Sequence, residues 1–316
     1  MDEFLALGET RMWDIVGKRY WFFAFSLLVT VPGLIALAIL GLPLSIDFAG
    51  GSLLKLQFEA APPQPAEVLA IYSEFGFTNS QVQSLADTGI QIRSQEMDEA
   101  QKNEVSAVIR ERLGAFTELE FSSVSPTIGT EVVQRALQTI GVATAGIMLF
   151  LWFAFRQVPH AFRYGVAAIL GLLHDVAVIV GMAALFGNLL GWQVDSLFLT
   201  ALLTMLGFSV QDKIVVFDRI RENLLRRRGE SYERIVNMSL IQTVARSLVT
   251  QLTMFFTMLA LALFGGVTIR NFIVILLIGL LSGTYSSIFN AAQILVVWEN
   301  REWRWWFRRG RAQPAA

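Results

Sequence analysis

Six long apolar stretches constrain this chain more than any other feature of its sequence. A helix needs roughly 20 apolar residues to cross the hydrocarbon core of a bilayer. Stretches of about that length run over residues 21–42, 133–155, 162–186, 194–217, 247–264 and 272–298. The first is too long for the roughly 7–15-residue core of a cleaved signal peptide, so we expect it to be retained. The sequence therefore predicts a polytopic α-helical membrane protein with six transmembrane helices.

Basic residues between the spans predict the orientation of the chain. Lys and Arg gather before the first span and after the second, fourth and sixth spans. The loop after the third span has none, and the loop after the fifth has only Arg270. Cytoplasmic loops carry the excess of Lys and Arg in membrane proteins. We therefore expect both termini in the cytoplasm and the segment between the first two spans outside it.

The segment between the first two spans differs from the rest in charge and periodicity. Between Ile46 and Pro126 there are twelve acidic and five basic residues, in a chain whose formal net charge is −1. The pattern predicts strands over 52–58, 80–86, 89–94 and 118–124, and helices over 65–76 and 97–114. The order β-α-β-β-α-β predicts a small ferredoxin-like α+β domain, with two helices on one face of an antiparallel sheet.

These patterns predict how the chain is divided. The expected parts are a cytoplasmic N-terminal segment (1–20), the first transmembrane helix (21–42), the extracytoplasmic domain (43–130), a five-helix bundle (131–298) with a cytoplasmic loop (218–246), and a basic, Trp-rich cytoplasmic tail (299–316). In the last span, Gly279 and Gly283 are spaced as GxxxG, which we interpret as ordinary close packing of helices.

Residue types that carry most enzyme chemistry are scarce. The chain has no Cys and only two His, His160 and His174, and the outer segment contains no glycine-rich phosphate loop. We therefore expect no enzymatic activity, no metal site and no other cofactor. The arginine-rich loop after the fourth span suits anionic lipid headgroups, so no nucleic-acid partner is expected.

Ionisable residues inside the spans are the main functional candidates. Each costs about 2.5–3.5 kcal/mol on insertion scales, so each is a candidate for a function. Asp212 lies about five residues inside the cytoplasmic end of its predicted span and could load and release a proton there. The alternative is that Asp212 only pairs with Lys213 or Arg246 and stabilises the bundle. Lys213 is itself expected to extend to the cytoplasmic surface.

Two further groups of residues accompany Asp212. Thr250 and Thr253 share one helical face with Arg246 and could supply the hydroxyl groups and the cation of a relay. The alternative is a juxtamembrane arginine with no such role. His174 and Asp175 lie near the middle of the third span and, being adjacent in sequence, are expected to point in different directions. Both are secondary relay candidates, and the alternative for either is a purely stabilising role.

Several motifs resemble those of the SecD/SecF protein-export family. Just after the first span, IDFAGG resembles the family's Asp-Phe-any-Gly-Gly signature, at Asp47, Gly50 and Gly51. The match continues in order through SPTIGTEVVQRA, HDV, VVFDRIREN, FGGVTIRNF and GTYSSIF, and so covers nearly the whole chain. The small outer segment and the VVFDRIREN motif point to the SecF branch over the SecD branch.

The resemblance implies a fold related to the resistance-nodulation-division transporters, in the bacterial inner membrane. The implied partners are SecD, the SecYEG channel, small accessory membrane subunits such as YajC, and preprotein. In the family, proton flow through the SecD–SecF interface is thought to drive motions of the outer domains that pull or hold preprotein. The family's transmembrane aspartate and arginine map onto Asp212 and Arg246. Asp47, Gly50 and Gly51 match the family signature at the junction between the membrane and the outer domain, where the two glycines are expected to act as a hinge.

The chain departs from the family pattern beside these residues. Gln211 replaces the usual asparagine and keeps its amide hydrogen-bonding capacity. Lys213 stands where a small hydroxyl residue is usual, and it adds a charge beside the implied ion relay. We take that relay to comprise Asp212, Arg246, Gln211 and Thr250. The coupling ion, proton or sodium, stays open at this stage.

Two other functions compete with that of an ion-driven export subunit. A half-transporter for small molecules would need a large apolar pocket in or beside the outer domain. A non-conducting scaffold would only stabilise partner subunits.

Overall fold

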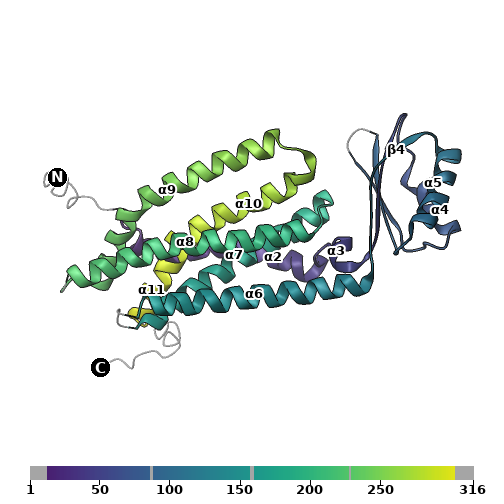
Figure 1. Ribbon diagram of the computed structural model, residues 1–316. Coiled ribbons are helices and arrows are strands. Elements are labelled where there is room, and N and C mark those ends of the chain that lie inside the picture. The colour runs from purple at the N-terminus through teal and green to yellow at the C-terminus, as the bar shows by residue number, and fades with distance from the viewer. Residues whose placement is uncertain (1–12, 86–87, 157–159, 228, 303–316) are drawn as a thin grey trace, which may run out of the picture. The chain divides into compact units, whose positions relative to one another are not determined.

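The computed structural model describes residues 13–85, 88–156, 160–227 and 229–302 (Figure 1). The chain divides into two compact units. One unit contains Leu44–Thr139 together with Gln193–Ser196, and the other contains the remaining described residues. The first unit holds the small sheet, and the second holds most of the long helices.

Six helices in the described part of the chain are long and apolar enough to cross a membrane, which confirms the predicted spans. They are Val16–Leu40 (η1, Val16–Lys18, followed by α2, Arg19–Leu40), α6 (Pro126–Ala154), α7 (Ala161–Leu190), α8 (Ser196–Arg226), α9 (Tyr232–Phe264) and Ile269–Glu299. Most of the predicted loop 218–246 is helical, because α8 and α9 both extend beyond their apolar stretches.

The last span is not a uniform α-helix. α10 (Val267–Tyr285) passes into a π-helical segment, η2 (Ser286–Ala291), and the chain continues as α11 (Ala292–Glu299). Single π-helical turns inside helices are rare and occur frequently at functional sites. The first two serines of η2 are fully buried, so this segment presents hydroxyl groups to the interior of the bundle.

Glycine residues allow the spans to approach closely. A Cβ atom on Gly33 of α2 would lie 2.8 Å from the backbone of Gly181 on α7, so this crossing leaves no room for a side chain. Gly279 and Gly283 of the predicted GxxxG pair both pack against α8, and a Cβ atom on Gly279 would lie 2.5 Å from Met205. The GxxxG spacing therefore serves packing between helices of this chain.

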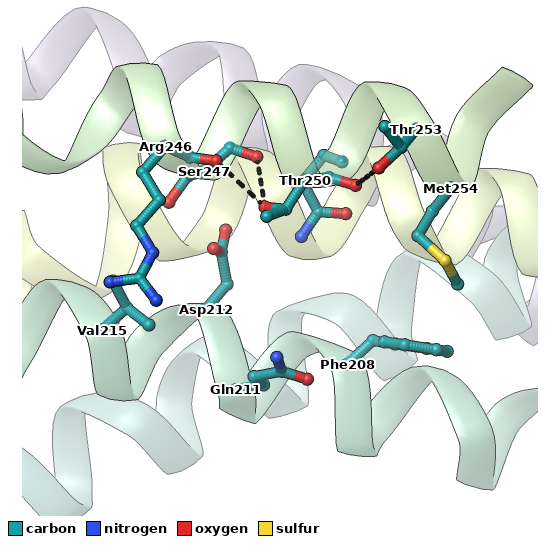
Figure 2. Close-up of a pocket in the computed structure, with 10 residues that line it drawn as sticks. Phe208, Gln211, Asp212, Val215, Arg246, Ser247, Thr250, Thr253 and Met254 are labelled. Atoms are coloured by element: carbon teal, nitrogen blue, oxygen red, sulfur yellow. Dashed lines mark hydrogen bonds between the residues drawn. The ribbon is translucent and has the colours of Figure 1, made fainter.

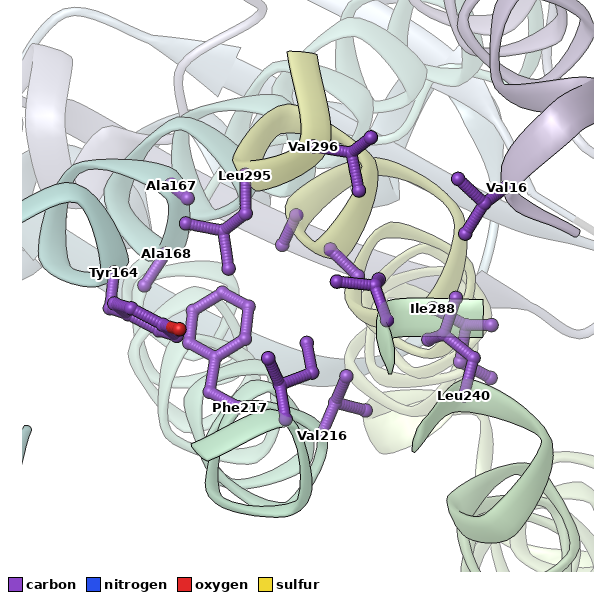
Figure 3. Close-up of a cluster of buried hydrophobic side chains, with 14 of the residues drawn as sticks. Val16, Tyr164, Ala167, Ala168, Val216, Phe217, Leu240, Ile288, Leu295 and Val296 are labelled. Carbon is purple, nitrogen blue, oxygen red and sulfur yellow. The ribbon is translucent and has the colours of Figure 1, made fainter. Parts of the chain in front are cut away.

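A hydrophobic cluster fixes α8 one turn beyond Asp212 (Figure 3). Val216 and Phe217 of α8 are fully buried there, and the ring of Phe217 packs edge-on against that of Tyr164 on α7, with centroids 5.5 Å apart. Other members come from η1, α7, α9 and the last span: Val16, Ala167, Ala168, Leu240, Ile288, Leu295 and Val296. This apolar packing sets the position of the adjacent polar turn of α8.

The first unit has the predicted ferredoxin-like topology. Its main elements are β1 (Gly51–Phe58), α4 (Pro65–Glu74), β2 (Gln81–Ser84), β3 (Gly89–Ser94), α5 (Glu99–Leu113) and β4 (Phe116–Val124). The strands lie in the order β2-β3-β1-β4, and every neighbouring pair is antiparallel. Both helices lie on one face of the sheet (Figure 1), as the sequence predicts.

Local sequence signals explain where the two outer helices begin. Pro65 occupies the first turn of α4, and a capping box joins Gln64 to Glu67. Asp98 caps α5 by accepting a hydrogen bond of 2.8 Å from the backbone N–H of Gln101. The buried residues of β1 and β3 alternate along each strand and form one core with residues of α4 and α5.

Candidate functional site

A polar cavity of about 290 Å³ lies between α8 and α9 (Figure 2). Its wall contains Phe208, Gln211, Asp212 and Val215 of α8, and Arg246, Ser247, Thr250, Gln251, Thr253 and Met254 of α9. The structure therefore brings together all four residues of the predicted relay. Their action as a relay stays a prediction.

Asp212 is the central acidic group of this cavity. Its side chain projects from α8 toward α9 in Figure 2, and only 6% of the residue is exposed. The buried Oδ2 atom has no hydrogen-bond partner among the described residues. Leaving a buried acceptor unsatisfied costs about 1–3 kcal/mol, and more for a charged group. Such an atom marks a place where a water molecule, a cation or a proton can bind.

Two more oxygen atoms in the cavity wall lack hydrogen-bond partners within the described structure. They are the buried atoms Ser247 Oγ and Gln251 Oε1, and both side chains interact with the carboxylate of Asp212. Neither residue belongs to the predicted relay, although their spacing of four residues places them on the same helical face. With Asp212 they make an unsaturated polar surface, and the cavity has room for several water molecules of about 30 Å³ each.

Arg246 and Thr250 complete the polar wall on α9. The hydroxyl of Thr250 donates to the backbone carbonyls of Arg246 (3.1 Å) and Ser247 (2.9 Å), so its proton stays on its own helix and only its lone pairs face a ligand. Within the residues described, Arg246 forms no ion pair with Asp212. The guanidinium and the carboxylate instead face a shared space between the helices.

Lys213 lies on a different side of α8, and one expectation about it is wrong. The side chain does not extend to the cytoplasmic surface but is fully buried. Its Nζ atom donates to Asp175 Oδ2 at 3.0 Å, to Ser286 Oγ at 2.9 Å and to Ser209 Oγ. Three acceptors inside the bundle satisfy the three N–H groups of the ammonium, so it does not need to reach water.

Asp175, a secondary relay candidate, is the anion of this buried pair. Its carboxylate also accepts hydrogen bonds from Ser209 (2.5 Å), Ser282 (2.7 Å) and Ser286 (2.7 Å). Sequence reasoning missed these serines because two of them lie more than 100 residues away on the last span. The only local signal was that Ser282 and Ser286 recur at i, i+4 and so share one helical face.

His174 lies beside this pair and contradicts the expectation that it points away from Asp175. Its Nδ1 atom lies 3.1 Å from Asp175 Oδ1. The Cα–Cβ bonds of adjacent helical residues diverge, but rotation about the side-chain bonds brings these two ends together. Neither residue lines the cavity of Asp212. The predicted primary and secondary relay residues therefore occupy two separate sites.

The predicted hinge residues form a packed junction. Asp47 lies in a short helix, α3 (Ile46–Ala49), which the sequence did not predict. Its Oδ2 atom accepts hydrogen bonds from the backbone N–H (2.9 Å) and the hydroxyl (2.8 Å) of Ser196, the first residue of α8. A carboxylate at this position satisfies an N–H group of the first helical turn and complements the helix dipole. Asp47 therefore caps α8.

The two glycines after α3 are required by the backbone. Gly50 and Gly51 have φ of +74° and +113°, a range that side chains disfavour. A Cβ atom on Gly50 would lie 2.6 Å from the Cα atom of Pro126, and one on Gly51 would lie 2.5 Å from the carbonyl oxygen of Ser94. The backbone conformation and the close contacts both explain why glycine occupies these two positions. Bending at this junction stays a prediction.

Two family descriptions match the chain. Residues 104–301 match "Protein export membrane protein SecD/SecF, C-terminal", which covers more than half of the chain. Residues 35–62 match "SecD/SecF GG Motif", and this range contains Asp47, Gly50 and Gly51. The first match includes Asp175, Asp212, Lys213 and Arg246, so it covers both polar sites described above.

Individual proteins show the same likeness. "Protein translocase subunit SecF" of Anaerolinea thermophila is 51% identical over 308 residues, which cover 96% of this chain and 100% of that protein. "Protein translocase subunit SecDF" of Bacillus subtilis is 34% identical over 92% of this chain and 39% of its own length. The crystal structure of SecDF from Thermus thermophilus matches with a TM-score of 0.80 and 31% identity, over 92% of this chain and 39% of that one.

Proposed function

Because this chain belongs to the SecD/SecF family of protein export membrane proteins, we propose that it is a SecF-type auxiliary subunit of Sec protein export that couples proton flow to preprotein translocation. The full-length likeness to SecF subunits supports the export role. In SecDF proteins, the part like this chain occupies 39% of a longer chain, which supports SecD as the partner.

The observation that carries the proton coupling is the unpartnered Oδ2 atom of Asp212. A coupling carboxylate must be shielded from bulk water and still have an open position for the ion. Asp212 meets both conditions, because it is 6% exposed and faces a polar cavity. Arg246, across the same cavity, can balance the negative charge when Asp212 has released its proton.

The outer domain is the proposed moving part. α8 begins at Ser196, which Asp47 caps, and runs as one helix through Asp212. A movement of α8 caused by protonation of Asp212 would therefore be transmitted through Asp47 to Gly50 and Gly51. In this proposal the ferredoxin-like domain responds by holding or releasing preprotein.

The remaining partners and the location follow from the same proposal. We place the subunit in the bacterial inner membrane with both termini in the cytoplasm. The clusters of Lys and Arg around the cytoplasmic ends support this orientation. The SecYEG channel, accessory subunits such as YajC and preprotein are the proposed partners besides SecD.

The test is translocation in inverted membrane vesicles that contain this chain, SecD and SecYEG. Asp212→Asn should assemble normally but lose the stimulation of translocation by a proton gradient. Asp218→Asn is the matched control, because Asp218 lies on the same helix but is about half exposed and pairs with Arg221 at 2.7 Å. The control should keep the stimulation.

Three outcomes would replace the proposal. Unchanged translocation with both Asp212→Asn and Arg246→Gln would indicate a scaffold that conducts no ion. Stimulation by a sodium gradient in place of a proton gradient would identify sodium as the coupling ion. Uptake of a small molecule by the purified protein, without an effect on export, would favour a half-transporter.

A further inference from the structure

The buried pair of Lys213 and Asp175 is saturated with hydrogen bonds. All three N–H groups of the ammonium have acceptors, and four donors from α8 and the last span reach the carboxylate: Lys213, Ser209, Ser282 and Ser286. Asp175 is 2% exposed and Lys213 is fully buried. A buried network in which every group is satisfied is rigid, and adding or removing a proton would break several bonds at once.

Asp212 is the opposite kind of buried carboxylate. Its Oδ2 atom has no partner among the residues described, and it faces a cavity. Lys213 follows directly in the chain, yet its ammonium group is committed to Asp175. The spans thus hold two buried aspartates, and the lysine is bonded to only one of them.

We propose that Lys213 selects Asp212 as the single proton-carrying aspartate of α7 and α8, because it holds Asp175 permanently as a charged carboxylate. The inference rests on the proposed function and assigns a specificity-determining role to the lysine. Without the cation, Asp175 would be a second buried carboxylate among hydroxyl groups and would have to take up a proton.

None of the other described groups near Asp175 is a permanent cation. On α7 the neighbour is His174, whose Nε2 atom is buried and has no partner within the described residues. The last span contributes serine hydroxyls and Tyr285, whose hydroxyl donates to the backbone carbonyl of Phe22 at 2.6 Å. α2, which packs on α7, carries no ionisable side chain between Trp21 and Leu40. Lys213 is therefore the permanent cation beside Asp175.

Space for the lysine is built into α7. A Cβ atom on Gly171 would lie 2.5 Å from Lys213 Cε and 3.4 Å from its Nζ atom. The side chain therefore runs directly across the backbone of α7 to reach Asp175. This fit is specific to a long, unbranched side chain and is consistent with a dedicated site for Lys213.

Infrared difference spectroscopy distinguishes the two aspartates, because a protonated carboxylic acid has a carbonyl stretching band that a carboxylate lacks. The sample is the full chain with SecD in lipid, titrated with acid. Beside the bands of the exposed carboxyl groups, the wild type should show a band that Asp212→Asn removes and Asp175→Asn keeps. Lys213→Met should show a second band, and adding Asp175→Asn should remove it.

Several results would overturn the proposal. One is a carbonyl band in the wild type that Asp175→Asn removes. Another is the absence of a second band in Lys213→Met. If that variant does not assemble with SecD, Lys213→Gln keeps two N–H donors without the charge and should gain the same band. A wild type without the Asp212 band contradicts the proposed function, whereas the second band in the lysine variants tests Lys213 independently.

Discussion

Asp212 and Lys213 are consecutive residues of α8, but their side chains belong to different sites. The carboxylate of Asp212 lines the cavity beside α9, and the ammonium of Lys213 bonds Asp175 on α7 at 3.0 Å. Successive positions on an α-helix are rotated by about 100°, so one helix can present a site to each of two neighbours. The lysine that stands beside the aspartate in the sequence is therefore not its ion-pair partner.

Gly171→Ala should destabilise the bundle. Its Cβ atom would meet Lys213 Cε at 2.5 Å, and the lysine cannot move without breaking its bonds to Asp175 and the serines. Overpacking of this kind costs about 1–3 kcal/mol. Thermal unfolding of the purified protein in detergent should show the loss. Gly207→Ala is the control, because nothing lies within 4 Å of a Cβ atom there, and equal effects of the two variants would contradict the predicted fit.

Gly50→Ala should cost more stability than Gly41→Ala. The two glycines have nearly the same backbone angles, with φ of +74° and +73° and ψ near 180°. That conformation costs a residue with a side chain about 1–3 kcal/mol. Only Gly50 adds a clash, since its Cβ atom would lie 2.6 Å from Pro126, whereas nothing lies within 4 Å of Gly41. Matching unfolding midpoints for the two variants would show that the junction is not tightly packed.

Asp47→Ala should loosen the beginning of α8. It removes the acceptor for the backbone N–H and hydroxyl of Ser196, and loss of a cap costs about 1 kcal/mol. Hydrogen exchange in the first turn of α8 should therefore become faster. Asp47→Asn keeps an acceptor and should show a smaller change. Equal exchange in the wild type and Asp47→Ala would mean that the cap is unimportant.

Glu302 should make stability depend on pH at the acidic end. Burial by itself raises the pKa of this carboxyl, but hydrogen bonds from Arg19, Tyr20 and Asn300 outweigh burial and hold its pKa below the ordinary value of about 4.3. The ionised form therefore stabilises the folded chain above that value, and this contribution disappears as pH falls through the lowered pKa.

The variant Glu302→Gln tests this dependence. It should be less stable than the wild type at neutral pH, by about 1 kcal/mol, because it removes the charge from the ion pair with Arg19. The difference should shrink as the pH falls below about 4. The measurement is the unfolding midpoint of both proteins at several pH values between neutral pH and the acidic end. A difference that does not vary with pH would assign the effect of Glu302 to packing.

Much of the fold was predictable because its signals are local. Span length and the alternation of apolar residues along strands act within a few residues, and they predicted both the six spans and the outer domain. The extent of α9 was not predictable, because its polar first half is helical although it lies outside the apolar stretch that marks the span. The short helix α3 and the π-helical segment η2 also carried no clear sequence signal.

The candidate site was predictable only in part. Asp212 and Arg246 stood out because ionisable residues are unusual inside spans, and helical spacing placed Thr250 on the face of Arg246. Gln211 was included because of its place in the family pattern. The partner of Lys213 was not found, because it depends on which side of α8 packs against α7 and the last span. That choice is made by contacts between residues far apart in the chain, such as Lys213 with Ser286.

If Asp212 carries the proton, proton flux through the protein depends on its carboxylate. This chain and SecD would be reconstituted in proteoliposomes that contain a pH-sensitive dye, and a pH gradient would be imposed. We expect proton flux in the wild type and in Asp218→Asn, and loss of that flux in Asp212→Asn. Flux in Asp212→Asn equal to that of the wild type would show that Asp212 does not carry the proton.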